Sequence, residues 1–124
     1  MAKVIEIRTE IQRVLNTVNS KIYFENAKDT TIYPYVVFDL PNSVDFGDLE
    51  NFVFDVDFWD DSQDTTLLET LCDNIDSVLH KQKFVINNEV SFVIYRDNRI
   101  NVKDDDERIK HRTYTYQLRA YGVY

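Results

Sequence analysis

The sequence predicts a single α+β domain over residues 1–124, built from a mostly antiparallel sheet of about four to six strands with two helices packed on one face. Two segments have apolar residues at helical spacing, and the segments around them alternate or run apolar as strands do. The order helix, strands, helix, strands is typical of this fold class. A chain of 124 residues that is 44% hydrophobic supports one core.

Two helices are expected. The first covers residues 4–18, where the apolar side chains recur on one side of a helix at Ile7, Ile11, Val14, Leu15 and Val18. The second covers about residues 62–80, where a broad apolar stripe is formed by Leu67, Leu68, Leu71, Cys72, Ile75, Val78 and Leu79. Cys72 is therefore expected to be a core side chain.

The remaining segments have strand character. Residues 21–24 form a short strand, residues 33–40 form a central strand, and a polar turn follows at 41–48. Residues 50–59 alternate, with Phe52, Phe54, Val56 and Phe58 on the core side. The last third is β-rich, with turns expected at Asn87-Asn88 and at residues 96–98 and with a solvated loop at residues 104–106.

Charge and composition limit the classes of function. The chain carries 22 acidic and 14 basic side chains, and the formal charge of −8 repels a phosphate backbone, so specific nucleic-acid binding is not expected. We find no apolar run that predicts a secretory signal or a membrane span. The one cysteine allows no internal disulfide, which suits a protein made in the cytoplasm.

The stretch FVFDVDFWDDSQDT, residues 52–65, concentrates five carboxylates and raises the question of a metal site. An EF-hand loop starting at Asp55 needs an oxygen ligand, a glycine and a glutamate where this chain has Trp59, Asp60 and Thr66. The acids are better explained as the solvated end of a strand followed by capping groups of the next helix. No metal ion is predicted here.

Other catalytic constellations are absent from the sequence. There is no Glu-x-Lys triplet after a partner strand and no glycine-rich phosphate loop. His80 and His111 have no ligand residue at metal spacing, and Cys72 has no activating cation nearby in sequence. We therefore predict no catalytic residue, no cofactor and no enzymatic activity.

Two groups of residues are candidates for contacts. Aromatic and arginine side chains that suit a protein interface are Trp59, Arg112, Arg119 and Tyr121, although an ordinary surface explains them equally well. The acidic run Asp104, Asp105, Asp106 and Glu107 has the composition of a solvated loop.

Three stretches carry a family resemblance: IYFENAKDTTIYPYVVFDL, then FWDDSQDTTLLETLCDNIDSVL, and finally HRTYTYQLRAY. Together with the N-terminal helix, their order and spacing over about residues 5–122 resemble those of the tail-terminator and tail-completion proteins of long-tailed bacteriophages. The segment RDNRINVKDDDERIK has no counterpart that we can place.

The resemblance implies an α+β subunit of a homo-oligomeric ring, commonly hexameric. Such a ring caps the tail tube, joins it to the head connector, and is found at the head–tail interface of a virion assembled in the host cytoplasm. The acidic run at residues 104–107 is then a candidate lining of the lumen, where it would repel DNA. Arg96, Arg99, Arg108 and Lys110 are candidates for salt bridges between subunits.

Two alternatives stay open at the level of sequence. An acidic decoy that imitates DNA and inhibits a host DNA-binding protein would use the net charge and the carboxylates of residues 55–64. A hydrolase or nuclease would need a site built from Asp55, Asp57 and Asp60.

Overall fold

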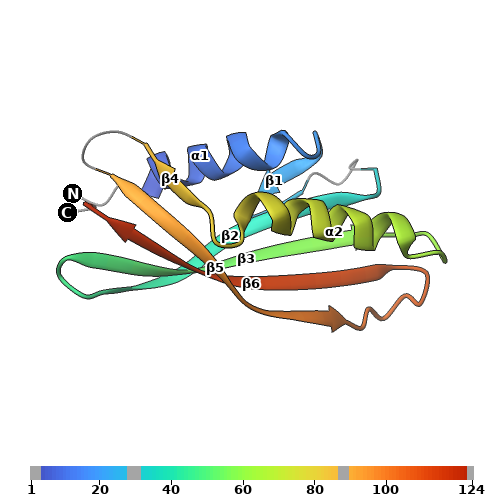
Figure 1. The fold of residues 1–124 in the computed structure, drawn as a ribbon. Coiled ribbons are helices and arrows are strands. Elements are labelled where there is room, and N and C mark those ends of the chain that lie inside the picture. Colours follow the sequence, from blue (N-terminus) through green and yellow to red (C-terminus); the bar gives the residue numbers. More distant parts are fainter. Residues whose placement is uncertain (1–3, 28–31, 87–89, 123–124) are drawn as a thin grey trace.

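The computed structural model describes residues 4–27, 32–86 and 90–122. Its sheet has six strands in the order β1-β2-β3-β6-β5-β4, and β1–β2 is the parallel pair among antiparallel ones. Both helices lie on the same face of the sheet (Figure 1). The α+β prediction is therefore confirmed. The elements in chain order are α1 Val4–Asn16, β1 Ile22–Phe24, β2 Tyr35–Asp45, β3 Leu49–Asp60, α2 Thr66–Leu79, β4 Lys83–Val85, β5 Ser91–Val102 and β6 Lys110–Tyr121.

The core lies between the sheet and the two helices. Every second residue is buried from Phe52 onward in β3, as the alternation of residues 50–59 predicts, and from Tyr114 to Ala120 in β6. The aromatic rings of this face interlock at centroid distances of 5.5 Å for Phe54–Tyr116 and 5.3 Å for Phe58–Tyr114. Both helices contribute their apolar stripes, so that Ile7, Leu15, Leu68 and Ile75 are fully buried.

The helices are shorter than the sequence predicts. α1 ends at Asn16 rather than 18, and α2 begins at Thr66 rather than about 62. Leu67, which we placed in the apolar stripe of the second helix, is 72% exposed. It is the second residue of the helix, and the inward positions of the first turns are taken by Leu68 and Leu71 instead.

Three strand predictions are corrected. Residues 41–45, predicted as a polar turn, continue β2 after a register shift between Asp39 and Asn42. Residues 96–98, also predicted as a turn, form a bulge inside β5, because β6 continues to pair with β5 on both sides of it. Finally, β2 is not central: β3 and β6 occupy the middle of the sheet. The predicted turn at Asn87-Asn88 lies outside the described residues.

A polar network ties the second helix to the core side of the sheet. The hydroxyl of the buried Tyr116 donates to Asp76 Oδ1 at 2.7 Å, and Arg96 Nη1 donates to Asp76 Oδ2 at 2.7 Å. Burial raises the pKa of Tyr116, and the hydrogen bond to Asp76 raises it further, so the phenol stays a donor. Asp76 therefore couples α2 to both β5 and β6.

We expect Tyr116→Phe to lower the free energy of unfolding by about 1 kcal/mol, because one buried hydrogen bond is lost. Asp76→Ala should cost more, about 2–3 kcal/mol, because it leaves the Tyr116 hydroxyl and the Arg96 guanidinium without their acceptor. Urea unfolding measures both values. Tyr121→Phe, at a side chain that is 41% exposed, is the control and should change little. Equal effects of the two tyrosine variants would contradict the assigned role of the network.

Candidate interaction surfaces

No helix or strand of the described residues covers the face of the sheet opposite the helices, and we call it the open face. It is formed by the alternate residues of β3 and β6 that point away from the core, together with their neighbours on β2 and β5. These side chains are mostly half-buried by one another rather than fully exposed. The face is therefore a packed, mixed aromatic and polar surface.

A row of rings crosses the open face near the ends of three strands. Tyr35 stacks on Trp59 at 5.2 Å, and Trp59 stacks on His111 at 4.3 Å with an interplanar angle of 18°. Tyr33 extends the row at 5.3 Å from Tyr35. The three stacked residues are direct neighbours in the register of β2, β3 and β6. Trp59, a predicted contact residue, is thus held rigidly by its neighbours.

Carboxylates lie beside this row. His111 Nε2 lies 2.8 Å from Asp57 Oδ1, and the Thr113 hydroxyl donates to the same oxygen at 2.5 Å. Asp55 accepts from the Thr115 hydroxyl at 2.9 Å. Burial raises the pKa of Asp55, and the negative charges of Asp57 and Asp39 raise it further.

These contacts are made between strands, so sequence spacing could not reveal them. The alternation of residues 55–59 indicated that Asp55, Asp57 and Trp59 share a face, but only the register of β6 adds His111, Thr113 and Thr115 to it. Among the described residues no group of three or more histidine, cysteine or acidic side chains is arranged to hold a metal ion.

The acids that follow β3 do not act as the sequence suggested. Asp60 is not part of a helix turn; it ends β3, is 5% exposed, and accepts from the Asp61 amide at 2.8 Å. Only Asp64 serves the helix start, because its Oδ1 accepts from both the amide and the hydroxyl of Thr66. These hydrogen bonds lower the pKa of Asp64. Thr65, the N-cap residue itself, makes no side-chain cap bond.

The structure separates the four predicted contact residues. Trp59, Arg119 and Tyr121 point to the open face, where Arg119 lies 5.7 Å from the ring of Tyr95. Arg112 points to the helix face instead, and its Nε donates to Glu69 Oε1 of α2 at 2.7 Å. The side chain of Arg112 is 14% exposed, so most of its surface is used inside the subunit.

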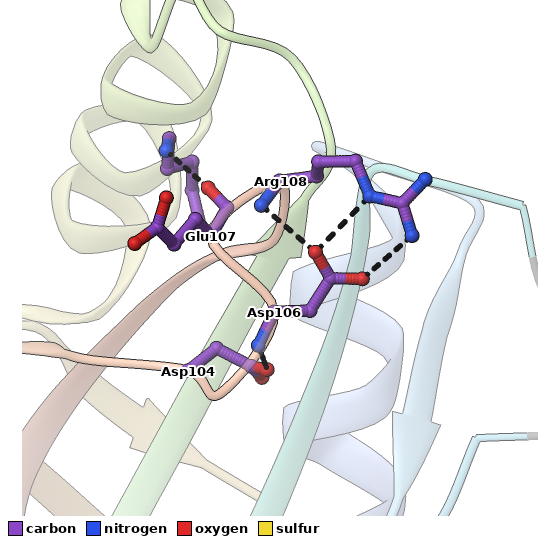
Figure 2. A network of polar contacts seen from close by, with 5 residues as sticks. Asp104, Asp106, Glu107 and Arg108 are labelled. Carbon is purple, nitrogen blue, oxygen red and sulfur yellow. Dashed lines mark hydrogen bonds and ion pairs between the residues drawn. The ribbon is translucent and has the colours of Figure 1, made fainter.

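The acidic run forms the loop between β5 and β6, as predicted, and Figure 2 shows how it is organised. Asp104 Oδ1 accepts from the Asp106 amide at 2.9 Å. Asp106 in turn accepts from the Arg108 amide at 3.0 Å and from its guanidinium at 3.1 and 2.9 Å. Hydrogen bonds from the side chain and the amide of Arg108 lower the pKa of Asp106 to about 2.

Half of this acidic run is therefore used to shape its own loop. Asp105 and Glu107 are exposed, and within the described residues their carboxylates make no hydrogen bond or ion pair. Arg108 and Lys110, candidates for salt bridges between subunits, bond within the loop to Asp106 and to the Glu107 carbonyl. Arg108 offsets the charge of Asp106, whereas Asp104 is bound only by a neutral amide, so Asp104, Asp105 and Glu107 keep their charges.

Two other sequence predictions concern side chains with reactive groups. Cys72 is buried, as predicted, and burial raises the pKa of its thiol to about 12, so it carries no thiolate at neutral pH. His80 ends α2, and its Nδ1 accepts from the Arg96 amide at 2.8 Å. Within the described residues, no helix has the length and hydropathy required to cross a bilayer.

The family model of tail completion protein gp17 matches residues 6–121. The chain belongs to this family. Membership makes it a phage structural protein, in agreement with the resemblance seen in the sequence. The comparison with curated proteins gives no match.

Solved structures support the fold of this tail completion protein. A chain of the virion of a native gene transfer agent particle superposes with a TM-score of 0.70 at 11% identity, covering 92% of this chain and 91% of that one. A second solved chain superposes with a TM-score of 0.60 at 12% identity, covering 100% of this chain and 98% of that one. At such identities these likenesses concern the fold alone.

We expect Asp55→Asn to stabilise the protein at pH 7. The pKa of Asp55 is raised in the folded state, so the folded protein binds more protons than the unfolded one just above the ordinary carboxyl pKa. Stability therefore falls as the pH rises through this window, and the amide avoids that loss. The gain should stay below about 1 kcal/mol because the group is partly exposed, and it should disappear below about pH 4.

Thermal unfolding between about pH 3 and pH 8, which spans the titration of carboxyl groups, measures the difference in stability between the variant and the unmodified protein. Asp105→Asn, at an exposed loop position, is the matched control and should follow the unmodified protein at each pH. A stabilisation by Asp55→Asn that persists unchanged at low pH would show that the effect is not the ionisation of this carboxyl.

Proposed function

We propose that this protein caps the tail tube and joins it to the head, acting as a homo-oligomeric ring, with six subunits favoured, that is assembled in the host cytoplasm. The observation that carries the proposal is the match of the tail completion family to nearly the whole chain, residues 6–121. The partners are then further copies of this chain, the tail-tube protein and the head connector. No step of this function requires catalysis, a cofactor or a membrane.

The open face gives this role a physical basis. It combines a rigid aromatic row with Arg119 and Tyr121 at the other end of the same strands, and interfaces between proteins are enriched in these residue types. Side chains that are already held by stacking lose little conformational entropy on binding. We assign Trp59, Arg119 and Tyr121 to contacts with a partner, whereas Arg112 supports the surface from the helix side through Glu69.

The loop at residues 103–109 lies at the end of the sheet opposite the β2–β3 hairpin (Figure 1). A loop at the end of a subunit can line the lumen of a ring, where Asp105 and Glu107 would repel passing DNA. Asp104 and Asp106 would then keep the loop in shape, since both are bound within it.

The joining role is tested in phage or prophage particles that lack this gene. We expect them to accumulate unjoined heads and tails, and the purified protein to restore joining. The double variant Arg119→Asp, Tyr121→Ala should restore joining at least about tenfold less well, because it removes contacts from the open face. Counting joined particles by electron microscopy measures this.

Leu67→Ala is the control for this experiment, because Leu67 is exposed on α2, away from the open face. It should restore joining fully. A chain that stays monomeric with tail tubes present, and binds a DNA-binding protein with strong salt dependence, would contradict the proposal and favour the acidic decoy.

The lumen assignment makes a separate prediction. Asp105→Asn with Glu107→Gln should leave assembly unchanged and lower infectivity, because the carboxylates that face DNA are neutralised while the loop keeps its hydrogen bonds. Infectivity per joined particle is the quantity to measure. The control is Asp48→Asn in the β2–β3 hairpin, at the opposite end of the sheet. Equal infectivity of the loop variant and the control would contradict the assignment of the loop to the lumen.

A further inference from the structure

Two long strands are paired on their outer side over only part of their length. β1 pairs with β2 at Val36–Phe38, and β4 pairs with β5 at Ser91–Val93, each over three residues. Beyond these ladders, no described strand lies beside the outer edge of Asn42–Asp45 in β2 or of Asn98–Val102 in β5. We call these segments the hairpin edge and the bulge edge. Every residue in both is exposed.

Such edges carry unpaired backbone groups that can accept another strand. In an antiparallel sheet, successive residues turn their N–H and C=O groups to opposite sides. The Val36 amide bonds outward to Lys21 and the Arg96 amide bonds outward to His80. When the alternation is followed through the register shift in each strand, the outward residues are Ser43 and Asp45 on the hairpin edge and Arg99 and Asn101 on the bulge edge.

We propose that the bulge edge of one subunit pairs with the hairpin edge of a second copy of this chain, as an antiparallel ladder that continues the sheet from subunit to subunit. This deepens the proposed function by naming the contact that builds the ring. The pairing places Arg99 opposite Asp45 of the neighbour and Asn101 opposite Ser43. Both pairs exchange backbone hydrogen bonds, and the first also pairs opposite charges.

The side chains agree with this register. Ile100 then faces Val44 of the neighbour, and these apolar side chains are 54% and 55% exposed in the isolated subunit. Both lie on the open face, because Ile100 is the register neighbour of Thr113 and Val44 that of Asn51. One contact therefore covers two exposed apolar residues and joins two unpaired edges.

The geometry also favours a copy in the same orientation. β2 and β5 run in opposite directions within the sheet, so a neighbour that has not been flipped presents an antiparallel strand. Across the sheet of one subunit, Ile100 is aligned through β6 and β3 with Val37 of β2. In the proposed contact, Ile100 instead faces Val44 of the neighbour's β2. Val37 pairs with Asp57 of β3 and Val44 pairs with Asn51, so the neighbour is shifted by six β3 residues, or about 20 Å, along the strands.

Four strand spacings separate equivalent strands of neighbouring subunits, a width of about 19 Å. A shift of about 20 Å over that width tilts the strands by about 45°, close to the tilt of closed barrels. The contact is heterologous and joins different edges, so rotation can close it into a ring. The shift also carries β1 of the neighbour past the end of β5, so these two strands do not compete for the same edge.

Disulfide capture tests the register. Val44→Cys and Ile100→Cys are made in separate full-length chains, with the buried Cys72 retained. Facing residues that do not exchange backbone hydrogen bonds are close enough for a disulfide. When the two variants are mixed at high concentration under mild oxidation, we expect a covalent heterodimer at least about tenfold above that formed by Val44→Cys with Val85→Cys. Val85 is exposed on β4 and lies outside the proposed contact.

No excess over the control pair overturns the proposal, and so does dimerisation of either variant alone to the same extent, which would indicate a two-fold contact. A charge exchange supplies the second test. Arg99→Asp or Asp45→Arg alone should weaken self-association, measured by sedimentation, and the double variant should restore it. Failure of the double variant to exceed both single variants also counts against the register.

The outcome separates this inference from the proposed function. If the protein joins heads to tails but the cysteine variants form no heterodimer, the proposed function stands and the strand pairing is wrong. If the heterodimer forms but the protein does not restore joining, the strand pairing stands and the proposed function is wrong.

Discussion

The constraint on which the structure depends is the antiparallel pairing of β3 with β6. The two strands pair along their whole lengths, from Leu49–Tyr121 to Asp60–Lys110. This register assigns one alternate set of side chains to the core and the other to the open face. A slip of one residue would move Phe54 and Tyr116 into solvent and the aspartates into the core, so the register is strongly specified.

The same pairing explains why a strongly acidic segment can lie in the middle of a sheet. Asp55 and Asp57 sit on the half-buried open face, where hydroxyls of β6 and the imidazole of His111 donate to them or lie beside them. Buried polar groups that have partners cost far less than those without. The carboxylates are thus part of the surface structure, and the sequence motif that resembled a metal loop follows from strand alternation.

The family assignment and the shape of the subunit agree on a protein that works by contact. The helices cover one face of the sheet, while the open face and two strand edges remain available. In an isolated protein such edges are shielded against aggregation by charges and bulges, and both free edges here follow a register shift. In an assembly the same edges can pair directly with a strand of another subunit.

The sequence by itself determined the fold class, the two helices, the buried face of β3, the loop at residues 104–106 and the family resemblance, because periodicity and composition are local properties of the chain. It misplaced the strand ends at residues 41–45 and 96–98, where polar residues typical of turns are held extended by partner strands. The grouping of Trp59 with His111 and the removal of Arg112 to the helix face were decided only by the tertiary structure. Cross-strand register and the packing of α2 depend on residues far apart in the chain, and no local pattern encodes them.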